Sequence, residues 1–163
     1  MKKLLAVDGN SIVNRAFYGV RPLSNKAGFP TNALFGTVSI LLKNIEAVKP
    51  DFAAIAFDLK APSFRHEFFA DYKAGRKPTP EDLLAQMPRA KEIAAAMGFI
   101  VLEKAGYEAD DILGTLAEMA AGEEYEAYIL TGDRDALQLI SERVHVLLAT
   151  NTETIDFTEN KFF

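Results

Sequence analysis

The chain has 163 residues, of which 49% are hydrophobic and 25% charged, and it contains no cysteine. This length and composition predict one folded domain, residues 1–163, with a real core. The lack of cysteine excludes disulfides and thiolate chemistry, and no apolar run is long enough to cross a membrane. The first apolar run meets Asp8 too early to be a signal peptide, so we expect a cytoplasmic protein without a membrane partner.

The first part of the chain alternates between short apolar runs and stretches with helical spacing. Residues 4–7 and 52–57 are apolar throughout, which predicts two strands buried on both faces, and each run leads into an aspartate. Between them the spacing predicts two helices joined by a loop over residues 21–30. The first helix is expected to be capped by Asn10 or Ser11.

A basic and aromatic segment, residues 59–80, interrupts this alternation. Its basic and aromatic side chains are Lys60, Phe64, Arg65, His66, Phe68, Phe69, Tyr72, Lys73, Arg76 and Lys77. Connections of this length within a compact domain are usually functional. Basic side chains bind phosphates and aromatic rings stack on unpaired bases, so the segment predicts a nucleic-acid contact. The alternative is a short amphipathic helix whose phenylalanines join the core.

The alternation then resumes. A helix that starts with Pro80 is predicted to run to Met97, with a bend or break at Pro88. The remaining predicted elements are a strand over 99–102, an acidic helix ending at Gly122, strands over 127–131 and 144–148 around a short helix over 134–140, and an edge strand over 154–157.

This order predicts an α/β fold with a mostly parallel central sheet of about five strands and helices on both faces. In such sheets the ligand site lies at the carboxyl ends of the strands. Asp8, Asp58 and Asp133 each lie just past the end of a predicted strand. Glu108 lies just beyond the third strand. We therefore expect these carboxylates to converge on one rim of the sheet.

Seven carboxylates lie at these strand ends or in the first turn of the acidic helix. They are Asp8, Asp58, Glu108, Asp110, Asp111, Asp133 and Asp135. The helix dipole accounts for one or two acids in a first turn, but not for acids gathered from four elements. Oxygen ligands without a thiol or a well-placed histidine suit Mg²⁺ or Mn²⁺. Two such ions about 4 Å apart would hold the attacking water and the leaving oxygen of a phosphodiester.

The acidic helix places its carboxylates in different directions. Neighbouring residues of a helix point about 100° apart, so Asp110 and Asp111 cannot face the same way. We expect one of them to contact metal directly and the other through water. Glu108 and Asp111 are three residues apart and are expected to point in roughly the same direction.

The formal net charge of −5 does not exclude nucleic acid as a partner. Setting the seven carboxylates aside leaves 16 of the 23 acidic residues against 18 lysines and arginines. The rest of the surface is then expected to be slightly basic, so the total charge does not decide whether the chain binds nucleic acid.

Six short motifs follow one another along nearly the whole chain. They are Val-Asp-Gly-Asn at 7–10, Ala-Phe-Asp at 56–58, Phe-Arg at 64–65, Tyr-Lys-Ala-Gly-Arg at 72–76, Gly-Tyr-Glu-Ala-Asp-Asp at 106–111 and Thr-Gly-Asp-Arg-Asp-Ala-Leu-Gln-Leu at 131–139. In combination they resemble the 5′-to-3′ exonuclease domain at the N-terminus of bacterial DNA polymerase I, a member of the flap-endonuclease family.

The resemblance implies a PIN-like 5′-nuclease fold and a metal-dependent phosphodiesterase of DNA replication and repair. Its substrates would be DNA with a 5′ flap or a nick, and RNA primers. It also implies a polymerase domain in the full-length chain, and we expect a monomer in the bacterial cytoplasm, associated with the nucleoid.

The same match assigns roles to individual residues. The seven carboxylates are the implied metal ligands, for probably two ions of Mg²⁺ or Mn²⁺ in a complete domain, and segment 59–80 is the implied helical arch over the free 5′ strand. Lys73 and Arg76 are the candidate catalytic side chains at the scissile phosphate. The candidate nucleic-acid contacts are Arg15, Arg65, Tyr72, Lys73, Arg76 and Lys77.

The chain departs from the family by ending at residue 163. Family members continue into a helical region with another pair of metal-site aspartates and a helix-hairpin-helix element. We therefore expect a truncated fragment whose second metal position, at Asp133 and Asp135, binds weakly. Two alternatives stay open: a catalytically silent fragment that binds branched DNA, and a single-Mg²⁺ phosphatase or phosphoacceptor domain. Against the latter, Asp8 is followed by Gly-Asn rather than by the Asp-x-Asp pattern of those enzymes.

Overall fold

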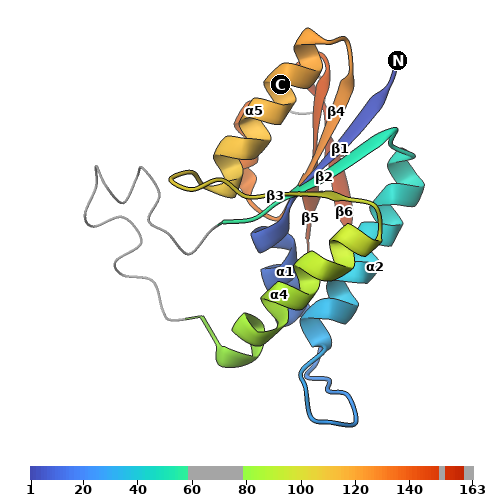
Figure 1. Ribbon diagram of the computed structural model, residues 1–163. Helices are drawn as coiled ribbons and strands as arrows, with labels where there is room; N and C mark the ends of the chain where they lie inside the picture. Colours follow the sequence, from blue (N-terminus) through green and yellow to red (C-terminus); the bar gives the residue numbers. More distant parts are fainter. Residues whose placement is uncertain (59–78, 151–152, 160–163) are drawn as a thin grey trace.

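The computed structural model describes residues 1–58, 79–150 and 153–159, and every structural statement below concerns these residues. A six-stranded sheet crosses the molecule in the order β3-β2-β1-β4-β5-β6 (Figure 1). The strands are β1 (Lys3–Asp8), β2 (Phe52–Ala56), β3 (Ile100–Leu102), β4 (Glu126–Thr131), β5 (Val144–Ala149) and β6 (Thr154–Phe157). All neighbours are parallel except β5 and β6. The mostly parallel sheet and its extra edge strand are confirmed.

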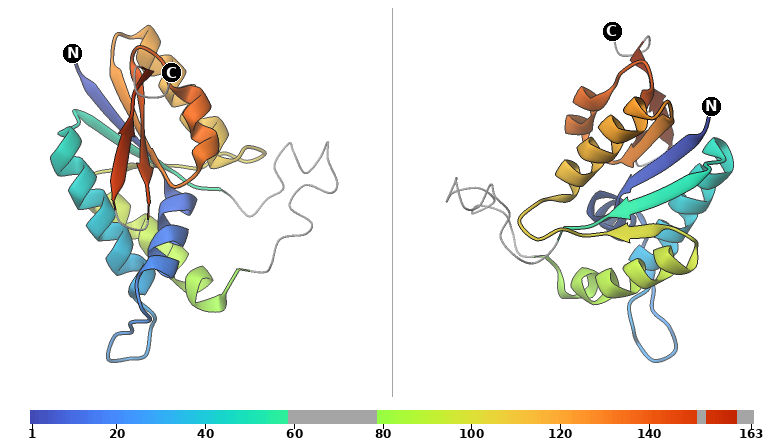
Figure 2. Two further views of the ribbon diagram at one scale, coloured as in Figure 1. Left: turned by 180° about the vertical axis from the view of Figure 1, so that it is seen from behind. Right: turned by 45° about the horizontal axis from the view of Figure 1, so that its top comes forward.

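Helices cover both faces of the sheet, as Figure 2 shows. They are α1 (Gly9–Gly19), α2 (Asn32–Val48), α4 (Glu81–Ala96), α5 (Ala109–Gly122) and the 3₁₀ helix η1 (Arg134–Leu139). The first three pack on one face, and α5 with η1 on the other. None of the described helices is long and apolar enough to span a bilayer.

Strand β1 shows why the sheet is buried on both sides. Leu5 and Val7 belong to the core under α1, α2 and α4, whereas Ala6 belongs to the core under α5. Successive side chains of a strand point to opposite faces, so an all-apolar run is what a strand with two covered faces requires. The core under α5 is rich in alanine, including Ala56 and Ala117, which lets this helix lie close to the sheet.

Two local features differ from expectation: α4 is not broken at Pro88, and α1 is not capped by Asn10 or Ser11. Helix α4 is continuous through Pro88, because this residue lies on the exposed side, where a carbonyl deprived of its amide partner can be solvated. Helix α1 is capped by Asp8, whose side chain accepts a hydrogen bond from the Ser11 amide, and not by Asn10 or Ser11. The side chain of Asn10 instead accepts from the amide of Asp58.

A buried pair of amide side chains joins α4 to the other helices of its face. Gln86 is fully buried and donates from Nε2 to Asn32 Oδ1 at 2.9 Å, while its Oε1 accepts from the Leu34 amide at 3.1 Å. Asn32 in turn donates to the carbonyl of Phe17 at the end of α1. Three helices therefore meet at one satisfied polar joint, which fixes how α1 lies beside the sheet.

Replacing Gln86 by leucine is predicted to lower the free energy of unfolding by roughly 2 kcal/mol. The substitution removes the partner of the partly buried Leu34 amide and of the Asn32 carbonyl oxygen, and each unsatisfied group costs about 1–3 kcal/mol. Urea unfolding measures the change. Gln138→Leu is the matched control, because Gln138 is exposed and should alter stability by less than about 0.5 kcal/mol. Equal effects of the two substitutions would show that the hydrogen bonds of Gln86 do not stabilise the contact between the three helices.

Candidate active site

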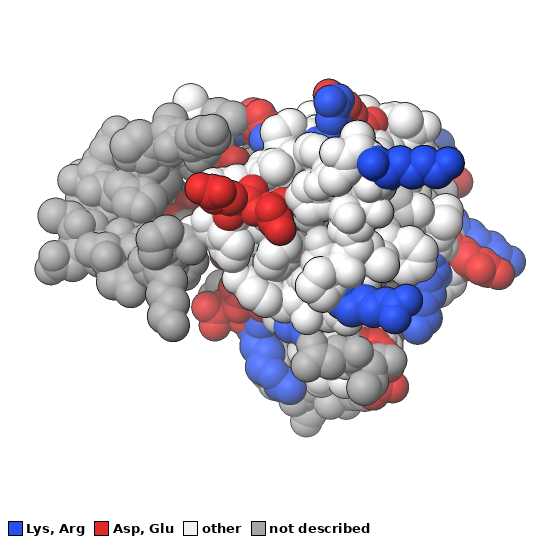
Figure 3. All heavy atoms as spheres, turned by 90° about the horizontal axis from the view of Figure 1, so that it is seen from below, with Lys and Arg blue, Asp and Glu red and all other residues white. Residues whose placement is uncertain are grey.

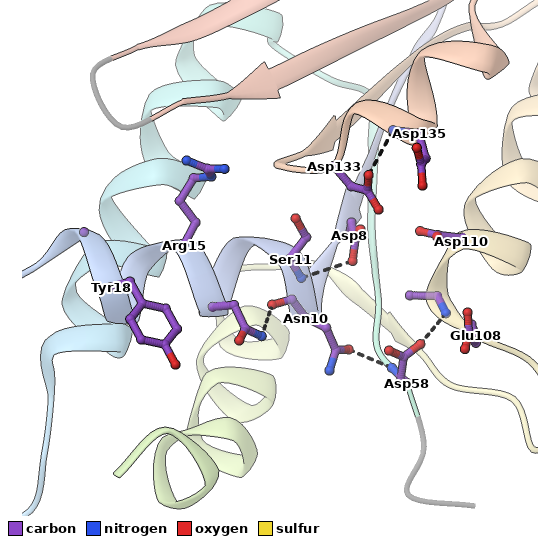
Figure 4. Close-up of a pocket in the computed structure, with 13 residues that line it drawn as sticks. Asp8, Asn10, Ser11, Arg15, Tyr18, Asp58, Glu108, Asp110, Asp133 and Asp135 are labelled. Atoms are coloured by element: carbon purple, nitrogen blue, oxygen red, sulfur yellow. Dashed lines mark hydrogen bonds between the residues drawn. The ribbon is translucent and has the colours of Figure 1, made fainter. Parts of the chain in front are cut away.

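A cavity of about 870 Å³ opens at the carboxyl ends of the parallel strands (Figure 4). Six of the seven predicted carboxylates line it, and we call it the acidic cavity. They are Asp8, Asp58, Glu108, Asp110, Asp133 and Asp135. The polar and aromatic residues Asn14 and Tyr18 extend it along α1.

The register of the sheet brings these acids together. Asp8 ends β1 and is level with Ala56, the last residue of β2, so Asp58 follows just beyond the same edge. On the other side of β1, Val7 is level with Leu130 of β4, which leads into the turn that carries Asp133. Because neighbouring parallel strands end at one rim, residues far apart in the sequence become neighbours there.

Asp8, Asp58 and Asp133 each accept a hydrogen bond from an amide at the beginning of a helix. Asp8 accepts from the Ser11 amide at 3.2 Å at the start of α1, and Asp58 accepts from the Ala109 amide at 2.6 Å at the start of α5. Asp133 accepts from the Asp135 amide at 2.9 Å at the start of η1. Free amides and the positive end of the helix dipole favour carboxylates, and so partly offset their mutual repulsion.

Small polar side chains hold the strand ends in place. Asn10 Oδ1 accepts from the Asp58 amide at 2.7 Å, which ties the end of β2 to α1. Ser11 Oγ accepts from the Gly132 amide at 2.8 Å, and Thr131 Oγ1 donates to Asp8 Oδ2 at 3.0 Å. Sequence reasoning gave these three residues no role at the site. The signal that was available is their position at a strand end or within three residues after it, in or next to the acidic motifs.

Crowding changes the ionisation of two carboxyls. Burial, helped by the neighbouring carboxylates Asp110 and Asp58, raises the pKa of Asp8 to about 7 against the opposing hydrogen bonds from Ser11 and Thr131. Burial also raises the pKa of Asp110, and its acidic neighbours, first Asp133, act in the same direction. The acidic cavity therefore holds negative charge that the protein alone does not neutralise.

The donor chemistry of the acidic cavity fits a hard divalent cation, because every candidate ligand is an oxygen. Within residues 1–58, 79–150 and 153–159, however, no three acidic or histidine side chains are close enough together to hold an ion as they stand. Like charges keep apart when nothing attracts them to a common point. A bound cation would require the carboxylates of Asp8, Asp110 and Asp133, which face the same space in Figure 4, to move toward one another.

Asp111 does not line the acidic cavity. Its Oδ2 accepts from the amide of Glu108 at 2.9 Å in a capping box at the start of α5. It borders a smaller cavity of about 260 Å³ between α5 and η1, which Glu108 and Asp110 also line. Asp110 and Asp111 thus point in different directions, as helix geometry demands. The role of Asp111 as a metal ligand stays a prediction.

The predicted nucleic-acid contacts divide into two groups. Arg15 lines the acidic cavity on the α1 side, and its Nη2 donates to the carbonyl of Gly132 at 3.5 Å. The others lie outside the described residues, namely Arg65, Tyr72, Lys73, Arg76 and Lys77. On the face drawn in Figure 3, the lysines and arginines that are described are scattered over the face and near its rim rather than gathered in one patch.

Without divalent cations, Asp8→Asn is predicted to remove a pH-dependent loss of stability. The pKa of this carboxyl is raised from 3.8 in the unfolded chain to about 7 in the folded one. The protonated carboxyl therefore stabilises the folded state fully below pH 3.8, and this stabilisation is lost as the pH rises through the folded pKa of about 7. Urea unfolding in EDTA at pH 5 and pH 8 should show a loss for the wild type that exceeds that of Asp8→Asn by roughly 2 kcal/mol. Glu118→Gln, at an exposed site on α5, should keep the wild-type pH dependence. Equal pH dependence of the wild type and Asp8→Asn would contradict the burial of this charge.

Alanine at Asp111 is predicted to lower stability, whereas alanine at the neighbouring Asp110 is not. Asp111→Ala removes the acceptor of the Glu108 amide and should lower the free energy of unfolding by about 1 kcal/mol. Asp110→Ala relieves repulsion and should leave stability unchanged or raise it. The two residues are adjacent in α5, so each variant controls for the helix propensity of the other. Urea unfolding in EDTA at pH 8 measures both, and a larger loss for Asp110→Ala would refute the assignment.

Known proteins resemble this chain over most of its length. Over 145 residues it is 47% identical to the thermostable DNA polymerase I of Thermus thermophilus, which covers 89% of this chain and 17% of that protein. It is 40% identical over 161 residues to a 5′-3′ exonuclease of Aquifex aeolicus, covering 99% of this chain and 55% of that protein. The chain therefore spans one sixth to about half of the length of these relatives.

Solved structures agree on the fold. The D15 protein of bacteriophage T5, crystallised with metal ions, superposes with a TM-score of 0.74 at 18% identity over 96% of this chain and 57% of that chain. The same protein, as a flap endonuclease variant with DNA and metal ions, gives an equal TM-score. The sheet with helices on both faces is thus the 5′-nuclease, PIN-like fold that the motifs predicted.

A family model described as 5′-3′ exonuclease, N-terminal resolvase-like domain, matches residues 3–163. Together with the identity to the polymerase and exonuclease relatives, this match covers every strand and helix that borders the acidic cavity. The chain belongs to the 5′-3′ exonuclease family, of which it represents the N-terminal resolvase-like domain.

Proposed function

We propose that this chain is the catalytic part of a nuclease that hydrolyses phosphodiesters in DNA or RNA, as a 5′-3′ exonuclease and 5′-flap endonuclease. The observation that carries the proposal is the acidic cavity, where four parts of the chain place six carboxylates around one opening at the strand ends. The names of the Aquifex and T5 proteins support the choice of activity. A catalytically silent DNA-binding fragment and a phosphatase are less well supported, because the relatives are named for nuclease or polymerase activity.

The cofactor we propose is Mg²⁺ or Mn²⁺, with two ions in the complete site. Asp8, Glu108 and Asp110 would hold one ion, and Asp133 with Asp135 would contribute to the second. Bound there, the cations supply Lewis acidity toward the phosphate and a water that is more easily deprotonated. The T5 D15 protein was solved with metal ions, which supports a divalent cation in a cavity of the same fold.

The residues of this chain then have distinct tasks. The helix starts at Ser11 and Ala109 hold the carboxylates of Asp8 and Asp58 in fixed directions. Arg15 lies at the side of the acidic cavity that α1 forms, where its positive charge can contact a phosphate of the bound strand. We further propose, from the family match, that Lys73 and Arg76 act at the scissile phosphate and that segment 59–80 is an arch over the free 5′ strand.

The proposed substrates are DNA with a 5′ flap or a nick and RNA primers. The structure of the T5 flap endonuclease variant with DNA supports a nucleic-acid substrate. The name of the Thermus relative supports a polymerase in the full-length protein, and we propose one there. We also propose that the protein acts as a monomer and works in the bacterial cytoplasm beside the nucleoid. Residues 1–163 would form a single nuclease domain within it.

Hydrolysis of a 5′-labelled flap DNA tests the activity. We predict cleavage that requires Mn²⁺ or Mg²⁺, stops with EDTA, and falls at least about 100-fold in Asp110→Asn, because the site loses a charge that would bind the cation. Glu118→Gln, an acid on the same helix outside the acidic cavity, should cleave at the wild-type rate.

The same assay on a longer form, which includes the region that follows in the relatives, separates the alternatives. Cleavage by the longer form alone would favour the DNA-binding fragment for this chain. Failure of both forms to cleave, or cleavage that continues in EDTA, would remove the proposal of a metal-dependent nuclease.

A further inference from the structure

One hydroxyl connects the two sides of the acidic cavity. Thr131 is the last residue of β4 and is fully buried. Its Oγ1 donates to Asp8 Oδ2 at 3.0 Å and accepts from the amide of Asp133 at 3.1 Å. Thr131 therefore links a carboxylate of β1 to the turn that carries Asp133, directly before η1.

The chemistry of the three groups fixes the direction of both hydrogen bonds. An amide N–H can only donate, so the amide of Asp133 occupies an acceptor position of the hydroxyl. The single proton of Thr131 is then available for the Asp8 carboxylate. Its other oxygen neighbour, Ser11 Oγ, lies farther away at 3.5 Å. A hydroxyl held from both sides can orient a carboxylate that has few other partners.

The turn after Thr131 packs tightly against α1. Ser11 Oγ accepts from the Gly132 amide at 2.8 Å, and the Ser11 amide donates to Asp8. A side chain at Gly132 would come within 2.7 Å of Arg15 Nε and 3.0 Å of Ser11 Oγ, so only glycine fits without displacing them. Asp8, the start of α1 and the turn before η1 are thus held as one unit.

We propose that Thr131 is a positioning residue that sets the spacing of the Asp8 and Asp133 carboxylates and thereby the affinity of the acidic cavity for a divalent cation. The inference rests on the proposed function, in which this cavity binds such a cation. Groups behind metal ligands commonly have this effect, and their loss costs about 10–100-fold in metal affinity. The residue itself would not touch the cation or the substrate.

The test is a calorimetric titration of the folded, metal-free chain with Mn²⁺. Thr131→Val keeps the shape of the side chain but removes the hydroxyl, and should weaken Mn²⁺ binding by about 10-fold or more. Thr131→Ser restores the hydroxyl and should bind within about threefold of the wild type, allowing for its freer rotation. Thr131→Ala repeats the test in case the valine variant does not fold, as urea unfolding will reveal.

Thr37→Val is the matched control. Thr37 is buried on α2, and its hydroxyl has no hydrogen-bond partner among the described residues. The same change of a buried threonine to valine should therefore leave Mn²⁺ binding unaltered.

Three results would overturn the inference. Wild-type affinity in Thr131→Val or Thr131→Ala would show that the hydroxyl does not set metal binding. Equal weakening in folded Thr131→Ser and Thr131→Val would show that shape, not hydrogen bonding, matters. Failure of the wild type to bind Mn²⁺ would overturn both the inference and the proposed function, which distinguishes that case from the first two.

Discussion

Mutual repulsion between carboxylates at one edge of the sheet is the constraint on which this structure depends. Parallel pairing of β1 with β2 and β4 brings their ends level, so Asp8, Asp58 and Asp133 meet although up to 125 residues separate them in the sequence. Burial among other acids raises the pKa of Asp8 to about 7, which measures how poorly this charge is accommodated. The fold offsets part of the repulsion with the starts of α1, α5 and η1, where free amides meet these three acids.

Such an arrangement opposes stability and suits function. Burying charge without a partner is unfavourable, so the apolar cores on both faces of the sheet must supply the stability that the acidic cavity removes. Carboxyl groups whose pKa is shifted by burial and by neighbouring charges are found preferentially at functional sites. A divalent cation would neutralise them, which is why the proposed nuclease function and the electrostatics of the cavity agree. The small polar residues Asn10, Ser11 and Thr131 hold the strand ends so that the acids stay in place without the cation.

Sequence patterns were sufficient to predict the strands and helices and the gathering of acidic residues at one edge of the sheet. Apolar runs such as residues 4–7 and 52–57 lead into aspartates, and the topology of parallel sheets places strand ends together. Hydrogen bonds between distant residues were not predictable, because no local pattern reports them. Gln86 pairs with Asn32 across 54 positions, and Thr131 with Asp8 across 123. The cap at Asp8 was not predictable from the local pattern either, because the same residue ends β1 and directly precedes α1. The capping box between Asp111 and the amide of Glu108 was likewise not predicted, and the role of Asp111 as a metal ligand stays a prediction.

We propose that the carboxylates of β1, α5 and the turn before η1 form one site for a divalent cation. Anomalous X-ray scattering from a crystal of the chain grown with Mn²⁺ tests this most directly. We expect manganese within the acidic cavity, with Asp8 and Asp110 oxygens about 2.1–2.3 Å from the ion, as is usual for hard divalent cations. Manganese bound only elsewhere, or a cavity that stays free of it while Asp8 and Asp110 remain apart, would show that these carboxylates do not form a cation site.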